Sequence, residues 1–119
     1  VMDAQATYEQ TVAECDRLLG RWYEVVAELA EATAEYRRVK GLTFDQKRRG
    51  NPKLSAAAIE ARVDGNEDVS ALLERRERLS GESMVLRENI GFIRQQLDHA
   101  RTKAVTERTV DQLEAQWGT

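Results

Sequence analysis

The sequence predicts an all-α fold in which two long helices form an antiparallel hairpin and associate into a helical bundle. Charged residues make up 33% of the 119 residues and aromatic residues 6%, with one proline, a composition typical of long helices rather than sheets. Apolar residues recur at alternating steps of three and four over two long stretches, the spacing that keeps one stripe of a helix facing a partner. The segment 41–66 separates these stretches, so the simplest arrangement folds them side by side.

The first long helix is expected to cover about residues 4–40. Its predicted seam consists of Tyr8, Val12, Cys15, Leu19, Trp22, Val26, Leu29, Thr33 and Tyr36. A second row repeats every seven residues beside it and consists of Leu18, Val25, Ala32 and Val39. Together they form a wider face than a two-stranded coiled coil needs, which favours a bundle. Cys15 is the only cysteine, so we expect a buried small hydrophobic side chain rather than a disulfide.

The connector is expected to cover about residues 41–66. Gly41 is a candidate for the residue that follows the end of the first helix. The run 43–46, Thr-Phe-Asp-Gln, has the form of a capping box. These signals leave two alternatives, a short helix over 44–49 or a kinked extension of the first helix.

Further along the connector, Pro52 disfavours helical geometry at Asn51 and therefore predicts a stop. Ser55 can cap a short helix from Ala56 to about Val63. Asn66 can cap the next helix, whose first turn carries two acids.

The second long helix is expected over about 67–107, followed by a terminal segment, 108–119, that is a short helix or a frayed extension. Its predicted seam consists of Val69, Leu72, Arg76, Leu79, Ser83, Leu86, Ile90, Ile93, Leu97, Ala100 and Ala104. In the terminal segment, Val110, Leu113 and Trp117 share a face that does not continue this seam.

Apolar residues off the predicted seams indicate association beyond one hairpin. Val85 and Phe92 are one heptad apart and would face water in a lone hairpin. We therefore expect a homo-oligomer, with a different protein using the same surface as the alternative. The candidate anchors at this interface are Trp22, Val85, Phe92 and Trp117.

Charge is unevenly distributed along the chain. The overall net charge is −3, but residues 1–36 carry −6 and residues 37–53 carry +6. The bases of the middle segment are Arg37, Arg38, Lys40, Lys47, Arg48, Arg49 and Lys53. They predict a possible contact with the backbone of a nucleic acid, without sequence readout. The alternative is a solvated turn whose bases complement the end of the first helix and an acidic surface.

The sequence contains no arrangement typical of a catalytic, metal or cofactor site. The single histidine, His99, follows Asp98, but adjacent helical residues point to different faces and no nucleophile accompanies them. Neither zinc-site spacing nor a glycine-rich phosphate loop is present. We therefore expect no enzymatic activity, no metal, no cofactor and no small-molecule substrate.

The sequence also indicates a location. No apolar run approaches the ~20 residues that a membrane-spanning helix needs, and the first residues are polar and acidic rather than those of a signal peptide. We expect a cytoplasmic protein with no membrane contact.

Three segments resemble small helical proteins encoded by bacteriophages and prophages. The segments are 34–41 (AEYRRVKG), 61–64 (ARVD) and 93–102 (IRQQLDHART). The resemblance spans about residues 8–108. Such proteins come from early gene clusters near replication and single-strand recombination functions. The resemblance implies a non-enzymatic accessory that binds a protein or nucleic acid during phage DNA metabolism, and it assigns no catalytic residue.

Overall fold

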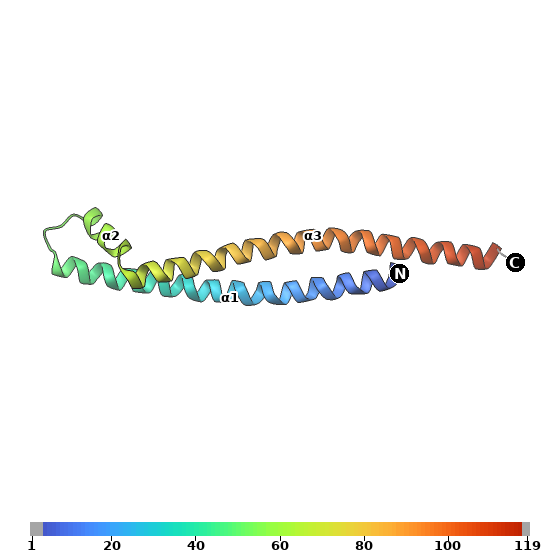
Figure 1. Cartoon of the computed structure of the whole chain (residues 1–119), viewed down its shortest axis with the longest axis horizontal. Coiled ribbons are helices and arrows are strands. Elements are labelled where there is room, and N and C mark those ends of the chain that lie inside the picture. The colour runs from blue at the N-terminus through green and yellow to red at the C-terminus, as the bar shows by residue number, and fades with distance from the viewer. Residues whose placement is uncertain (1–3, 118–119) are drawn as a thin grey trace. The chain divides into compact units, whose positions relative to one another are not determined.

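The computed structural model describes residues 4–117, which form three helices and no strand. The helices are α1 (Ala4–Gly50), α2 (Ala56–Asp64) and α3 (Glu67–Trp117) (Figure 1). The chain is therefore an all-α antiparallel helical hairpin with a short helix in the connection, which confirms the predicted fold class. Within 4–117, no helical segment combines the length and the apolar character that crossing a bilayer requires.

The chain divides into two compact units. The connecting unit comprises residues 23–84, and the terminal unit comprises the described residues of 1–22 and 85–119. In each unit a stretch of α1 runs antiparallel to a stretch of α3 (Figure 1).

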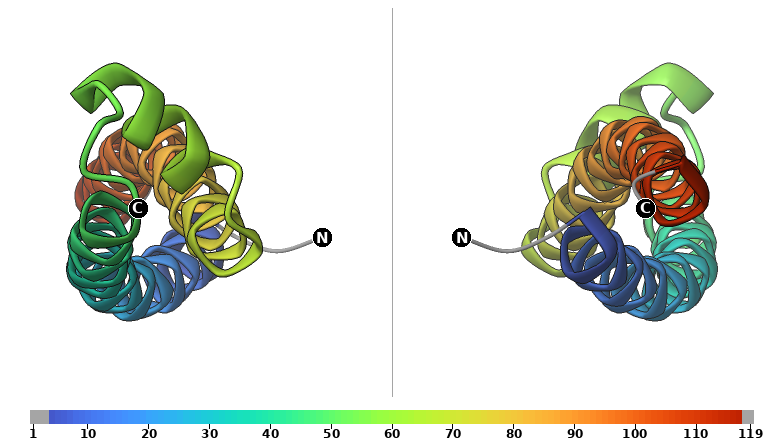
Figure 2. Two further views of the ribbon diagram at one scale, coloured as in Figure 1. Left: turned by 90° about the vertical axis from the view of Figure 1, so that its left-hand side faces the viewer. Right: turned by 90° about the vertical axis from the view of Figure 1, so that its right-hand side faces the viewer.

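The connecting unit has a compact apolar core to which all three helices contribute. Its buried residues are Tyr36, Ile59, Val63 and Val69, and Val39, Phe44, Leu54, Leu72 and Leu73 pack against them. Ile59 and Val63 are four residues apart on α2, so one face of this short helix supplies both. As a result α2 lies against one side of the α1–α3 pair in this unit (Figure 2).

Capping side chains fix where the helices of the connection begin, as the sequence predicts. Ser55 Oγ accepts a hydrogen bond from the backbone N–H of Ala58 at 3.2 Å. Asn66 Oδ1 accepts two, from the N–H groups of Asp68 at 3.0 Å and Val69 at 3.2 Å. Each bond satisfies a donor that the first turn of a helix leaves unpaired.

The predicted end of the first helix near Lys40 is wrong, because α1 continues without a break to Gly50. The row that faces α3 does not stop at residue 40: Val39 and Phe44 pack on the core and Thr43 is buried. Burial of these residues outweighs the cost of about 1 kcal/mol for Gly41 inside a helix. Of the two alternatives for 44–49, the extension is the one formed, and Pro52 follows its end as predicted.

The predicted end of the second long helix near residue 107 is also wrong, because α3 continues to Trp117. The Thr109 hydroxyl does not cap a new helix; it donates to the carbonyl oxygen of Val105, one turn earlier, at 3.0 Å. Loss of the apolar phase after Ala104 therefore marks where burial ends and not where the helix ends. Residues 118 and 119 of the predicted terminal segment lie outside the described residues.

The seam of α1 differs from the prediction in one of its two rows. Val26 is 38% exposed, whereas its neighbour Val25 and, one heptad later, Ala32 are fully buried. The buried face thus combines the row of Cys15 and Tyr36 with the row of Val25 and Ala32. The row of Val26 and the row of Val25 lie on either side of the row of Cys15 and Tyr36. Each is three or four residues from it, so spacing alone could not decide which of the two is buried.

The predicted seam of α3 is confirmed, and we call it the inner seam. Each of its members from Val69 to Ala104 is buried or half-buried, including the polar Arg76 and Ser83. In the terminal unit, the buried residues include the large Leu86, Ile90 and Ile93 and the small Ala4, Cys15, Ala100 and Ala104. No residue between 105 and 117 is buried.

Candidate functional site

The seven bases predicted to form one patch are placed in different environments. Arg37, Arg38, Arg48, Arg49 and Lys53 are exposed, whereas Lys40 and Lys47 are half-buried. The structure therefore does not present residues 37–53 as one uniform basic surface.

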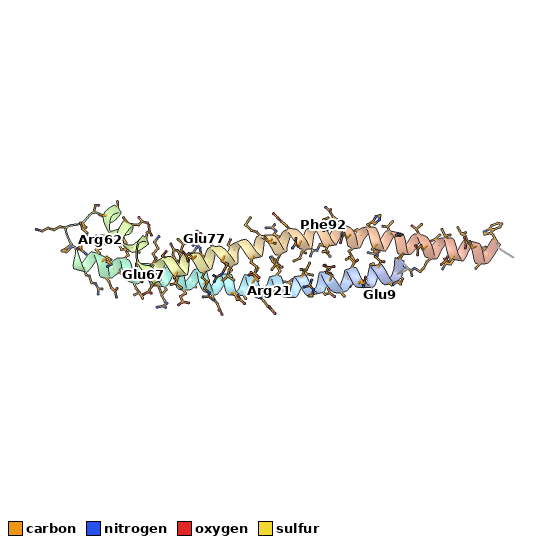
Figure 3. The ribbon with its side chains drawn as sticks, viewed as in Figure 1. Glu9, Arg21, Arg62, Glu67, Glu77 and Phe92 are labelled. Carbon is orange, nitrogen blue, oxygen red and sulfur yellow. The ribbon has the colours of Figure 1, made fainter. Side chains whose placement is uncertain are left out.

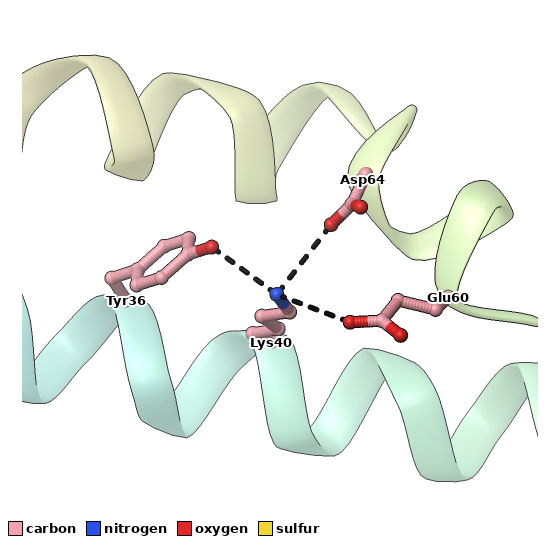
Figure 4. A network of polar contacts seen from close by, with 4 residues as sticks. All are labelled: Tyr36, Lys40, Glu60 and Asp64. Carbon is pink, nitrogen blue, oxygen red and sulfur yellow. Dashed lines mark hydrogen bonds and ion pairs between the residues drawn. The ribbon is translucent and has the colours of Figure 1, made fainter. Parts of the chain in front are cut away.

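Lys40 is held by groups of the connecting unit (Figure 4). Its Nζ donates a hydrogen bond to the Tyr36 hydroxyl at 3.4 Å and lies 3.9 Å from a Glu60 oxygen and 3.6 Å from an Asp64 oxygen. The bond to Tyr36 raises the pKa of Lys40 above its ordinary value of 10.5; partial burial opposes this, and the charges of Asp64 and Glu60 support it. Lys40 therefore ties α2 to α1.

Two cations lie close to the ring of Tyr36. Lys40 Nζ lies 5.6 Å from the ring centroid, and the guanidinium carbon of Arg76, from α3, lies 4.9 Å from it. Cations at these distances are attracted by the ring quadrupole. Two residues that sequence reasoning assigned to a phosphate patch and to a polar seam position thus meet at one buried tyrosine.

The bases at the end of α1 complement its C-terminus. Lys47, Arg48 and Arg49 occupy the last turn, where positive charge interacts favourably with the helix dipole. Asn51 closes this end, because its Nδ2 donates to the Lys47 carbonyl at 3.0 Å while its Oδ1 accepts from Arg62 of α2 at 3.2 Å. This arrangement supports the structural alternative for part of the basic segment.

Four arginines of the segment remain available for an external anion. Arg37 and Arg48 are eleven residues apart, as are Arg38 and Arg49. Eleven residues are close to three helical turns, so each pair shares a face and is separated by roughly 16 Å along the axis. Arg48 and Arg49 also line a shallow surface hollow with Asp45 and Pro52.

Three of the four predicted interface anchors are exposed. The exposed fractions are 56% for Val85, 61% for Phe92 and 79% for Trp117. Phe92 lies on α3 in the terminal unit (Figure 3). Trp22 differs from these three, because it is half-buried on the row of α1 that faces α3.

The exposed anchors belong to a second row on α3, which sequence reasoning missed and which we call the outer seam. It consists of Val85, Asn89, Phe92, Gln96, His99, Lys103, Thr106, Val110, Leu113 and Trp117. These residues alternate at steps of four and three, and every one of them is exposed. Each member from Val85 to Lys103 comes one residue before a member of the inner seam, so the outer seam lies roughly 100° around α3 from the inner seam. The spacing can be read from the sequence, but the polar residues in the middle of the outer seam separate its two apolar ends, so the ends do not look like one row.

A surface hollow of the terminal unit adjoins the middle of the outer seam. Its α3 lining includes Phe92, Gln96, His99 and Lys103, and its α1 lining is Thr7 and Thr11. The Thr11 hydroxyl donates to the Thr7 carbonyl at 2.8 Å, so its proton is already used within α1. The hollow thus offers a mixed polar and apolar surface beside a large exposed ring.

The opposite side of α3 carries a row of arginines. Arg87, Arg94, Arg101 and Arg108 repeat every seven residues and are all exposed. By the same rotation per residue, this row lies about half a turn from the outer seam. The outer seam is consequently almost free of charge, with Lys103 as its one permanently charged member.

Among residues 4–117 no group of three or more His, Cys, Asp or Glu side chains is placed to hold a metal ion. His99 is exposed on the outer seam. No family model, curated protein or solved structure matches this chain.

Proposed function

We propose that this is a non-enzymatic interaction protein that binds another protein chain through the outer seam of α3. The observation that carries the proposal is the exposure of five apolar side chains on one face of one helix, Val85, Phe92, Val110, Leu113 and Trp117. Exposed apolar surface of this extent, with polar residues between, is typical of a site of protein association.

The distribution of these side chains suits helix-to-helix binding. Because they follow the spacing of three and four, a partner helix can contact all of them along one line. Burying them contributes roughly 25 cal/mol per Å² of apolar surface. The polar residues in the middle of the seam add less affinity, but they penalise partners that offer no hydrogen bond there.

We place this activity in phage or prophage DNA recombination or replication, in the cytoplasm. The resemblance of segments 34–41, 61–64 and 93–102 to small helical phage proteins supports this setting.

Site-specific photo-crosslinking in bacterial cells tests the proposal. A photoreactive amino acid replaces Phe92 or Trp117 on the outer seam, or Asp98, an exposed residue on a different face of α3, as the matched control. We expect crosslinked protein from positions 92 and 117 at several times the yield from position 98. Equal yields at the three positions would remove the outer seam as a binding surface.

A second candidate function, direct binding of nucleic acid, is favoured by the exposed arginine pairs of α1, Arg37 with Arg48 and Arg38 with Arg49. Basic side chains that meet phosphates release counterions, so binding weakens steeply with salt. Arg48→Ala/Arg49→Ala should weaken binding of a single-stranded oligonucleotide and flatten its salt dependence, measured by fluorescence polarisation at two salt concentrations. Arg94→Ala/Arg101→Ala is the charge-matched control. Absence of binding at low salt, or equal losses in both variants, would reject the arginines of α1 as the site.

A further inference from the structure

We propose that the occupant of the outer seam is a second copy of this chain, with the two α3 helices antiparallel and a two-fold axis passing near residue 101. The inference rests on the proposed function in one respect, that the outer seam is a surface for protein association. It adds the identity of the partner, the direction of its helix and the register.

The outer seam is symmetric in character about its own midpoint. Apolar residues occupy both ends, Val85 and Phe92 at one and Val110, Leu113 and Trp117 at the other. Polar residues fill the middle, from Gln96 to Thr106. A two-fold interface brings the same patch of both copies together, so it requires a patch that matches its own reverse. The outer seam meets this requirement.

Pairing about residue 101 places like with like in nearly every layer. The layers are Val85 with Trp117, Asn89 with Leu113, Phe92 with Val110, Gln96 with Thr106 and His99 with Lys103, each formed twice. Only the layer of Asn89 and Leu113 mixes a polar with an apolar side chain. The remaining layers bury apolar against apolar surface or join polar groups.

Neighbouring antiparallel registers match less well. Moving one helix by seven residues in one direction places Phe92 against Lys103 and Trp117 against Arg78. Moving it by seven in the other direction places His99 against Val110 and Gln96 against Leu113. Both shifts bury polar groups against apolar ones, which is costly unless those groups find hydrogen bonds.

Side-chain size favours the antiparallel over the parallel direction. In a parallel pair each residue meets its own copy, so Trp117 faces Trp117 and Lys103 faces Lys103. In the antiparallel pair the large Trp117 meets the smaller Val85, and the large Phe92 meets the smaller Val110. Alternation of large and small residues across a contact fills space without strain.

The edge of the proposed contact carries no like-charge conflict. The row beside the outer seam, on the side away from the inner seam, consists of Glu88, Gln95, Thr102, Thr109 and Gln116. In the proposed register Glu88 lies near Gln116 of the second copy, and the others meet neutral groups. At the axis, the two Lys103 side chains are long enough to carry their charges to the solvent.

The inner and outer seams leave room for both neighbours of α3. They are separated by roughly 100° around the helix, close to the right angle between adjacent contacts in a four-helix bundle. The arginine row points away from the second copy. Residues 105–117, none of which is buried in one chain, gain a neighbouring helix along their length. In proteins most helical stability comes from packing of one face, so the second copy would stabilise this end of α3.

Disulfide trapping in mixtures of single-cysteine chains tests the register. In a Cys15→Ala background, Gln96→Cys and Thr106→Cys chains are mixed and oxidised. We expect a disulfide between the two different chains and none between identical ones, because identical positions lie about 15 Å apart along the axis in the proposed register. Disulfides between identical chains would show the parallel direction and overturn the inference. Trapping of Gln96→Cys with His99→Cys instead would show a shifted register and overturn it as well.

Light scattering coupled to size exclusion tests the association itself. We expect a particle of twice the 13.5 kDa chain mass. Phe92→Glu/Val110→Glu should weaken dimerisation at least ~100-fold with unchanged helix content, whereas Arg94→Ala/Arg101→Ala, on the opposite side of α3, should leave it intact. A wild-type monomer at ~100 μM overturns the inference. If photo-crosslinks from positions 92 and 117 then lead to a different protein, the proposed function stands without it; if they are also absent, both fail.

Discussion

The role of Lys40 in the structure differs from the role that the sequence predicts. In the sequence it is one of seven bases in a polarised segment, and in the structure it joins Tyr36 to two acids of α2. Its Nζ lies 5.6 Å from the centroid of the buried Tyr36 ring, while the side chain stays partly in solvent. The acids that hold it lie at positions 60 and 64, too far along the chain for a local pattern to reveal them.

Replacing Lys40 with methionine, which keeps the length of the stem, should lower the free energy of unfolding by about 0.5–1 kcal/mol at neutral pH, because partly exposed ion pairs and cation–π contacts are individually modest. Urea unfolding monitored by circular dichroism measures this loss. Arg37→Met, at an exposed base, is the control and should change the free energy by less than about 0.5 kcal/mol.

The contribution of Lys40 should also depend on pH in a defined direction. Its pKa is raised in the folded state, so its stabilising effect is fully present below the ordinary value of 10.5 and is lost as the pH rises through the folded-state pKa above it. The difference in unfolding free energy between wild type and Lys40→Met should be constant from about pH 7 to 9 and shrink in stronger base. A difference that grows with pH would contradict the assignment.

At the scale of the helix, the continuity of α1 through Gly41 is the main departure from expectation. An added Cβ at Gly41 would meet nothing within 4 Å, and the glycine has no positive φ. Gly41→Ala should therefore raise the free energy of unfolding by about 0.5–1 kcal/mol, as expected for alanine in an exposed helix interior. Thermal unfolding measures whether Gly41→Ala raises or lowers the stability. If the helix ended here with a left-handed glycine, the substitution would destabilise the protein instead.

Ile59 and Val63 anchor α2 in the core of the connecting unit, and Ile59 provides a direct test of its docking. Ile59 is 2% exposed in the core of the connecting unit. Ile59→Ala should cost about 2–4 kcal/mol, since it removes buried methyl groups and leaves a cavity. Ala57→Ser, at an exposed position of the same helix, is the control and should change the free energy by less than about 0.5 kcal/mol. Equal unfolding free energies for the two variants, measured by denaturant unfolding, would show that Ile59 is not buried in this core and that α2 packs elsewhere.

Local signals predicted the elements that depend on local chemistry. Ser55, Asn66 and Pro52 mark helix boundaries correctly, because a cap or a missing N–H acts within one turn. Gly41 and Thr109 gave wrong helix boundaries. Each resembles a boundary signal, but the helix continues through it because packing or the helix propensity of the neighbouring residues outweighs the signal. The choice between the two rows of α1 depended on where α3 sits, which no short stretch of sequence encodes.

At the scale of the molecule, each unit has its own set of buried residues. The core residues of the connecting unit, from Tyr36 to Leu73, all lie within 23–84. A fragment of residues 23–84 should therefore be helical and unfold cooperatively on heating, monitored by circular dichroism. The isolated peptide 85–117, whose partner stretch lies in α1, should be largely unfolded at low concentration. A fragment 23–84 without a cooperative transition would show that its core needs the remaining chain.

The same scale explains why the candidate surfaces were only partly predictable. Val85, Phe92 and Trp117 could be identified as surplus apolar residues once the inner seam was accounted for. The sequence could not show which bases of residues 37–53 hold α2 and which are exposed, because this depends on where α2 docks. The continuity of the outer seam required knowing that α3 extends to Trp117 without a break.

The thiol of Cys15 can report how often the terminal unit opens. It is the only thiol in the chain and is buried at 6% exposure between α1 and α3. A maleimide or another thiol reagent can reach it only when this end of the hairpin separates, so the rate of labelling measures how often that separation occurs under native conditions. Because no second thiol competes, the reaction needs no mutagenesis and no partner.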